Sequence, residues 1–173
     1  VLDLHSFDIS DVNIANIKGA LEANFVIHAA SIASPFFYRK YPLKTVDANI
    51  WGLRSLLEAY KQQNSLKGFL FFSSSEIYGD PLSESIPTDE NYKGNVSCNG
   101  PRACYDESKR FGETLCWIYS EQHNMPIVVA RPFNNFGPGM NINDKRLPAD
   151  FAKNIVENKD IEIFSDGKPT RTY

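Results

Sequence analysis

The stretch GFLFFSSSE, residues 68–76, is the part of this 173-residue sequence that decides the fold. Both alternating sets of positions in its first half are apolar, which is typical of a strand buried on both faces of a parallel sheet. The run then changes abruptly to serines and a glutamate. Two other short apolar runs have the same character, FVIHAA at 25–30 and PIVVARPF at 126–133. Three such runs predict three buried strands.

Segments with helical spacing lie between these strands. Over 43–63, apolar residues recur every three or four positions and charged residues fill the opposite face. A second long helix is expected over 103–123. This alternation predicts a parallel α/β fold with right-handed crossovers, a Rossmann-like doubly wound sheet. Weaker signals predict a helical stretch at 14–22, a helix at 148–157, a strand at 161–164 and a turn at 165–168.

Composition and charge narrow the class of protein. The chain is 42% hydrophobic and 23% charged, as in ordinary globular proteins, and its charge of -3 gives no general attraction for nucleic acid. Cys98, Cys104 and Cys116 show no CxxC spacing, so neither a disulfide scaffold nor a metal site is expected. A reducing, cytoplasmic location fits these cysteines. No run approaches the ~20 apolar residues of a membrane span, and the first residues do not resemble a signal peptide.

Polar residues follow each of the three predicted strands. They are Ser31 after the first strand, the cluster 73–76 after the second, and Asn134 with Asn135 after the third. Ligands of parallel α/β sheets bind outside the carboxyl ends of the strands, so these residues should meet at one crevice. The long irregular segment 81–101 is of a length that usually carries function.

Tyr105 and Lys109 are four residues apart on a predicted helix, so their side chains should share one face. A lysine ammonium beside a phenol lowers its pKa, and a tyrosine so activated can remove a proton from a sugar hydroxyl. A pair on the helix surface has the same spacing. The serine-rich end of the strand at 68–74, which could supply a hydroxyl partner, favours the functional interpretation.

Two long motifs, SSSEIYGDP at 73–81 and GPRACYDESKRFGETLC at 100–116, resemble the extended short-chain dehydrogenases/reductases, the NAD-dependent epimerase/dehydratase family. Within it they are most similar to UDP-glucuronate decarboxylases, as are ASPFFY at 33–38 and NDKR at 143–146. The resemblance implies NAD as cofactor, a nucleotide sugar, most often UDP-linked, as substrate, and a homodimer. The interface would lie on helices 43–63 and 103–123, near Trp51, Leu115 and Trp117.

The resemblance also implies catalytic roles. Ser74 would hydrogen-bond the sugar O4, Tyr105 would act as the base and Lys109 as its partner. Ser75 and Glu76 match residues of the decarboxylation step. In related 4,6-dehydratases an Asp-Glu pair stands at these last two positions, so Ser75 argues against a dehydratase.

Further residues match binding positions of the family. For Ala29 and Ala30 the alternative is ordinary core packing, for Asn134 a turn after a strand, and for Arg146 and Arg171 a solvated surface charge. The cofactor positions are Asp8, Ile9, Ala29, Ala30, Asn49, Tyr105, Lys109 and Pro132, and the substrate positions are Ser34, Asn134, Arg146 and Arg171.

The chain differs from a complete family member. It has no GxxGxxG loop of the kind that lets backbone approach a pyrophosphate. We therefore expect a fragment without the first βαβ unit and without the C-terminal part of the substrate domain. Residues 1–135 would form part of the NAD-binding domain, and 136–173 would begin the substrate region. Pro138, Gly139 and Met140 replace a family GPRM motif, which affects substrate choice.

Three functions follow as hypotheses. The leading one is NAD-dependent decarboxylation of UDP-glucuronate through a 4-keto intermediate. A nucleotide-sugar 4-epimerase would share Ser74, Tyr105 and Lys109 but would not need Glu76. A non-catalytic nucleotide-binding homologue is the alternative from another class.

Overall fold

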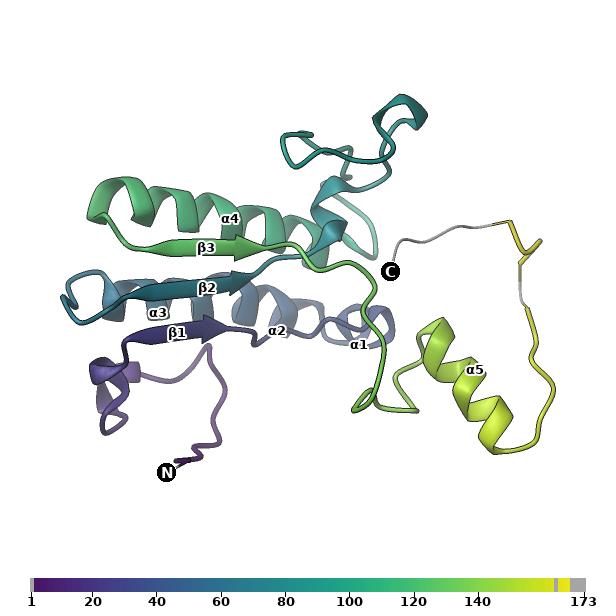
Figure 1. The fold of residues 1–173 in the computed structure, drawn as a ribbon, viewed down its shortest axis with the longest axis horizontal. Coiled ribbons are helices and arrows are strands. Elements are labelled where there is room, and N and C mark those ends of the chain that lie inside the picture. Colours follow the sequence, from purple (N-terminus) through teal and green to yellow (C-terminus); the bar gives the residue numbers. More distant parts are fainter. Residues whose placement is uncertain (1, 164, 169–173) are drawn as a thin grey trace.

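Three parallel strands form the centre of the molecule (Figure 1). The structure, a computed structural model, describes residues 2–163 and 165–168. The strands β1 (Phe25–His28), β2 (Gly68–Phe72) and β3 (Ile127–Ala130) pair in the order β1-β2-β3. Every pairing is parallel. The predicted parallel α/β architecture is therefore confirmed.

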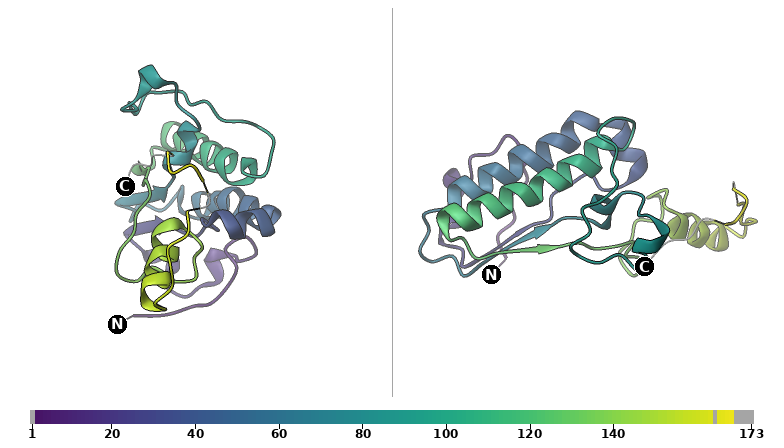
Figure 2. Two further views of the ribbon diagram at one scale, coloured as in Figure 1. Left: turned by 90° about the vertical axis from the view of Figure 1, so that its right-hand side faces the viewer. Right: turned by 90° about the horizontal axis from the view of Figure 1, so that it is seen from above.

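Two helical segments lie side by side on the same face of this sheet and form one layer (Figure 2). After β1 the chain runs through α2 (Pro42–Val46), a π-helical segment (Asp47–Gly52) and α3 (Leu53–Tyr60) without a break. The second helical segment is α4 (Ala103–His123), which lies in the connection between β2 and β3. Because each right-handed crossover leads to the next strand in the same direction, both must pass over the same face.

The opposite face of the sheet is open among the described residues. Phe25, Ile27 and Val128 have 69%, 63% and 62% of their surfaces exposed. The expectation that the strand at 68–74 is buried on both faces is met on one face only. The described elements therefore show one of the two layers that a doubly wound fold carries.

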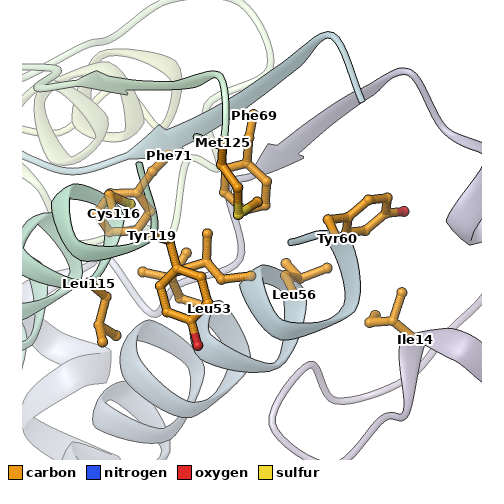
Figure 3. Packing of buried hydrophobic residues seen from close by; sticks show 11 residues of the cluster. Ile14, Leu53, Leu56, Tyr60, Phe69, Phe71, Leu115, Cys116, Tyr119 and Met125 are labelled. Carbon is orange, nitrogen blue, oxygen red and sulfur yellow. The ribbon is translucent and has the colours of Figure 1, made fainter. Parts of the chain in front are cut away.

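The hydrophobic core lies between the sheet and the helices (Figure 3). Leu53 of α3 and Phe71 of β2 are completely buried, and Cys116 of α4 packs with them. Gly112 lets α4 approach β2 closely, since a β-carbon there would lie 2.6 Å from Phe71 Cζ. This close approach brings the first turns of α4 to the carboxyl end of β2.

Four local predictions need correction. Residues 14–22 form two 3₁₀ turns (Ile14–Asn16 and Ala20–Glu22), because Gly19 between them takes a left-handed φ of 77°. The strand at 126–133 ends at Ala130, before Pro132. Residues 161–163 form no strand. The helix α1 (Pro35–Lys40) was not expected, although Ser34-Pro35 is a common way to start a helix.

The remaining segments lie at the carboxyl ends of the strands. A 3₁₀ turn (Ser75–Tyr78) follows β2 directly, and the long connection to α4 contains another (Ser83–Ser85). This connection projects from the sheet, and α5 (Leu147–Val156) lies beyond the strand ends (Figure 1). In the described part of the chain, no helix combines the length and apolar character needed to cross a membrane.

Candidate active site

Ser74, Tyr105 and Lys109 lie together where β2 meets α4. Ser74 follows β2, and Tyr105 and Lys109 are on the buried side of the first turns of α4. All three are buried, with exposed fractions of 6%, 6% and 2%. Lys109 Nζ donates a 2.6 Å hydrogen bond to the carbonyl of Phe72, the last residue of β2. The structure thus brings together the three residues that the motifs indicated.

The pKa of Tyr105 is raised, and burial is the largest cause. A hydrogen bond from Ser74 and the charges of Arg146 and Arg102 oppose this rise, whereas Asp106 adds to it. The net direction is opposite to the lowering expected from the spacing of Tyr105 and Lys109. The physical reason is desolvation, which disfavours the phenolate more than the neighbouring groups favour it.

Lys109 is an ammonium group in an apolar environment. It lies 5.1 Å from the ring centroid of Phe71 and 5.9 Å from that of Tyr105. Burial lowers the pKa of Lys109 to about 8. His28, at the end of β1, is also buried, and burial together with the charge of Lys109 lowers its pKa to about 4. A neutral histidine therefore lies close to the amine.

Tyr38, in α1, stacks on Tyr105. The ring centroids are 5.2 Å apart and the planes differ by 13°. Tyr38 is 2% exposed, and burial raises its pKa. Such a stack fixes the plane of the Tyr105 ring. Tyr38 ends the ASPFFY motif, but no role was predicted for it, because the α1 helix that presents it was not expected.

Asn49 supports the helix that carries the site. It is fully buried in the π-helical segment, and its Nδ2 donates to Ser108 Oγ at 2.8 Å. Ser108 Oγ in turn donates to the carbonyl of Tyr105 at 3.0 Å. Asn49 therefore ties the π-helical segment to the first turn of α4.

Glu76 lies in the turn after Ser74, and Ser74 Oγ accepts a 3.2 Å hydrogen bond from the Glu76 N–H. The Glu76 carboxylate forms an ion pair with Arg102, which was not singled out in the sequence. The Ser75 N–H donates to the carbonyl of Pro132 at 3.0 Å. Pro132 therefore holds this turn to the strand end through its backbone.

An open cavity of about 1020 Å³ lies beside these residues. Ser75, Glu76, Arg102 and Asn134 are among the residues that line it, whereas Ser74, Tyr105 and Lys109 are not. The cavity is therefore adjacent to the buried Ser-Tyr-Lys group, but the side chains of that group do not form its wall. It is large enough for a drug-sized or larger small molecule.

Ser34 and Arg146 meet through one loop. Ser34 Oγ donates to the carbonyl of Asp144 at 3.0 Å, and Arg146 is paired with the Asp144 carboxylate. The charge of Arg146 acts on Tyr105. The hydroxyl of Ser34 thus anchors the loop that places Arg146 near the site.

The remaining predicted residues belong to other segments of the chain. Ala29 and Ala30 are exposed directly after β1. Asp8 accepts hydrogen bonds from Ser10, which lower its pKa, and Ile9 packs over Gly52. Arg171 lies outside the described residues.

Arg131, which follows β3, connects the ends of the strands to α4. Arg131 makes two hydrogen bonds to Glu113, at 2.9 and 2.7 Å, and a third to Tyr78 Oη at 2.9 Å. Ser73 Oγ donates to the same glutamate at 2.5 Å. No local sequence pattern indicated this network, because its members come from segments that are far apart along the chain.

Several groups near the strand ends suit a dinucleotide cofactor. Ala29 and Ala30 have small side chains that let a ligand approach the backbone. The buried hydroxyl of Ser31 has no hydrogen-bond partner among the described residues. Lys109 has three N–H groups, and the structure shows one protein acceptor for them. Unpaired groups of this kind suit the hydroxyls of a ribose.

Fold and site together define a Rossmann-like α/β protein with a buried Ser-Tyr-Lys group. The NAD dependent epimerase/dehydratase family matches residues 1–173. The chain therefore belongs to this family of enzymes, as the motifs indicated.

Curated relatives and solved structures agree with this assignment. The chain is 39% identical, over 88% of its length, to UDP-glucuronic acid decarboxylase 1 of Xenopus tropicalis and to UDP-glucuronic acid decarboxylase 5 of Arabidopsis thaliana. It spans 35% of the length of the Xenopus protein and 44% of the length of the Arabidopsis protein. The structure of UDP-glucuronic acid 4-epimerase from Bacillus cereus with UDP-glucuronic acid and NAD is similar, with a TM-score of 0.73 and 29% identity over 95% of this chain and 49% of that chain. UDP-glucose 4-epimerase from Thermotoga maritima, with a TM-score of 0.79 and 22% identity over 95% of this chain and 52% of that chain, shares the fold.

Proposed function

We propose that the full-length protein is an NAD-dependent enzyme that decarboxylates UDP-glucuronate through a 4-keto intermediate. The observation that carries this proposal is the position of Glu76. It lies two residues after Ser74 at the same strand end and lines the cavity beside the buried Ser-Tyr-Lys group. The relatives named UDP-glucuronic acid decarboxylase support it.

The first step is oxidation at C4 of the sugar. Tyr105 accepts the proton of the C4 hydroxyl while Ser74 hydrogen-bonds O4. When bound, NAD would supply the reversible hydride chemistry at C4. Ala29, Ala30 and Lys109 would hold the cofactor. Since burial raises the pKa of Tyr105, the positive charges of Arg102 and Arg146 help the phenol release its proton.

The second step is loss of CO2. Oxidation makes the C6 carboxylate β to a ketone, so the C5–C6 bond can break and its electron pair passes into an enolate over C5, C4 and O4. A proton is then added at C5, on the side where Ser75 and Glu76 line the cavity. Return of the hydride to C4 and of the proton to O4 leaves no net redox change.

A 4-epimerase is the second candidate. The solved structure of UDP-glucuronic acid 4-epimerase from Bacillus cereus favours it, because that enzyme acts on the same uronic acid without losing its carboxylate. Such an enzyme would use Ser74, Tyr105 and Lys109 in the same way. A non-catalytic homologue is opposed by the presence of all three residues in one buried group.

The product mass after incubation with UDP-glucuronate distinguishes these functions. Decarboxylation lowers the mass of the nucleotide sugar by one CO2, whereas epimerisation leaves it unchanged. A product of unchanged mass with altered chromatographic mobility would contradict the decarboxylase and favour the 4-epimerase. NAD binding without any product would favour the non-catalytic homologue.

Glu76→Gln tests the residue on which the proposal rests. We expect this change to slow CO2 release by roughly 10²-fold or more, the usual contribution of a general acid or base. Reduction of bound NAD by UDP-glucuronate, followed by NADH absorbance, should persist. Glu84→Gln, an exposed glutamate in the same connection, is the matched control. Wild-type CO2 release by Glu76→Gln would contradict the decarboxylase.

We further propose a homodimer whose interface lies on the solvent-exposed side of α4 and of the helical segment 42–60. Trp51 and Trp117 are 54% and 66% exposed there. Leu115, which was expected to help locate the interface, is instead buried in the core and is unavailable. Light scattering on the full-length protein should give the mass of two protomers, and the mass of one would contradict the proposal. The cytoplasmic location stays a prediction.

A further inference from the structure

Three charged side chains form a chain at the edge of the cavity. Arg102 immediately precedes α4 and contacts two carboxylates at once. One of its terminal nitrogens pairs with Glu76, and its Nε donates to Asp106 Oδ2 at 3.2 Å. The guanidinium of Arg102 therefore connects the turn after β2 to the first turn of α4.

Asp106 is the fixed end of this chain. Its side chain is 9% exposed, compared with 31% for Glu76. Burial raises the pKa of Asp106 and the charge of Arg102 lowers it. A buried carboxylate with one cationic partner holds that partner strongly, because separation would leave the charge unpaired. Asp106 therefore anchors the guanidinium, and the guanidinium in turn determines where the carboxylate of Glu76 lies.

The geometry requires an arginine. Its planar guanidinium presents separate N–H groups to two carboxylates in fixed directions. A lysine ammonium at position 102 would keep the positive charge, but it is a compact group on a flexible stem. It could pair with Asp106 or with Glu76, yet it would not hold both in one arrangement.

We propose that Arg102 is a positioning residue that holds the Glu76 carboxylate at the cavity, in a fixed position relative to the helix that carries Tyr105 and Lys109. This inference rests on the proposed function. The steps at C5, which involve Glu76, then depend on Arg102 through the ion pair. Hydride transfer at C4, which involves Tyr105, depends on the positive charge of Arg102 but not on its ion pair with Glu76.

The charge of Arg102 is a separate influence, because it also lowers the pKa of Tyr105. A neutral substitution would therefore disturb the C4 step and would leave Asp106 buried without its partner. Arg102→Lys avoids both effects, since it keeps the charge and removes the fixed geometry. Arg110→Lys is the matched control. Arg110 lies on the same helix and donates to the carbonyls of Ile77 and Lys93 in the same connection, but it does not contact Glu76.

The experiment follows both steps in the full-length NAD-bound protein after mixing with UDP-glucuronate. Absorbance of bound NADH reports the C4 step, and CO2 release reports the loss of the carboxylate. Arg102→Lys should slow CO2 release by roughly 10- to 100-fold, as small misplacements in active sites do. NADH formation should stay at the wild-type rate. Arg110→Lys should change neither rate.

The double variant shows whether Arg102 acts through Glu76. In the Glu76→Gln background, Arg102→Lys should cause no further slowing of CO2 release, because the positioned group is already gone. Independent, multiplicative effects would overturn the inference, as would equal slowing of both steps or wild-type rates in Arg102→Lys. Failure of the wild-type protein to release CO2 is a different result, which would remove the proposed function before any variant is compared.

Discussion

The two halves of α4 bury different kinds of side chain on the side of the helix that faces the rest of the protein. The first half buries polar groups, namely Tyr105, Asp106, Ser108 and Lys109, and the second half buries Leu115, Cys116 and Tyr119. The second half faces the core between α3 and the sheet (Figure 3). The first half faces the carboxyl ends of the strands, where the chain turns polar.

This difference shows how one helix stabilises the fold and also carries the site. Burial of apolar side chains contributes favourable free energy, while burial of a charged group costs free energy unless it is well paired. The lowered pKa of Lys109 is a sign of that cost. The first half of α4 is therefore expected to matter for chemistry and to reduce stability, and the second half is expected to do the reverse.

The largest expected effect is that of Tyr105→Phe on turnover. The change removes the proton acceptor and keeps the ring that stacks on Tyr38. We expect a loss of ~10²- to 10⁴-fold in kcat, as is usual for a general base, with NAD binding nearly intact. Steady-state kinetics and NAD titration measure this, and Tyr41→Phe, at an exposed tyrosine, is the control. Unchanged turnover would show that the first half of α4 is not the chemical half.

Leu115→Ala tests the other half of α4. Leu115 is 7% exposed in the core, so truncation leaves a cavity, and we expect a loss of about 3 kcal/mol in the free energy of unfolding. The kcat of the folded protein should stay at the wild-type value. Urea unfolding measures the change, with Thr114→Ala at the neighbouring exposed position as control. A large fall in kcat without a change in stability would reverse the comparison.

Lys109→Met tests whether the polar half reduces stability. The folded-state pKa of Lys109, about 8, lies below its ordinary value of 10.5, so the unfolded chain binds more protons between these values and stability rises with pH. From pH 7 to pH 9.5, the wild-type protein should gain about 2 kcal/mol relative to Lys109→Met. Urea unfolding at the two pH values measures this. An equal change in the free energy of unfolding of the two proteins between these pH values would mean that burial of Lys109 does not reduce stability.

The smallest effect is expected at His28, beside Lys109. Its folded-state pKa, about 4, lies below its ordinary value of 6.5, so stability falls as the pH drops through this window. From pH 7 to pH 5.5, the wild-type protein should lose about 1 kcal/mol more than His28→Leu. Chemical denaturation at both values measures the difference. An equal loss in both proteins would place the acid sensitivity in other groups.

The three strands, the long helices, the helix face shared by Tyr105 and Lys109 and the polar end of β2 could all be predicted from the amino-acid sequence alone. This was possible because the signals are local. Apolar periodicity identifies an element from its own residues, as for α4, whose predicted bounds of 103 and 123 agree with the structure. The spacing of Tyr105 and Lys109 defines a shared helix face in the same way, and the polar end of β2 follows from the chain order.

Features that depend on contacts between distant segments could be found only in the folded structure. The stack of Tyr38 on Tyr105, the network of Arg131 and Glu113, and the ion pair of Arg102 with Glu76 join segments that no local pattern relates. It also reversed the expected direction of the Tyr105 pKa, since the depth of burial depends on how α4 packs against β2. Periodicity specifies which side of an element is buried, but the desolvation and the partners that each buried polar group experiences are determined by the packing of the whole chain.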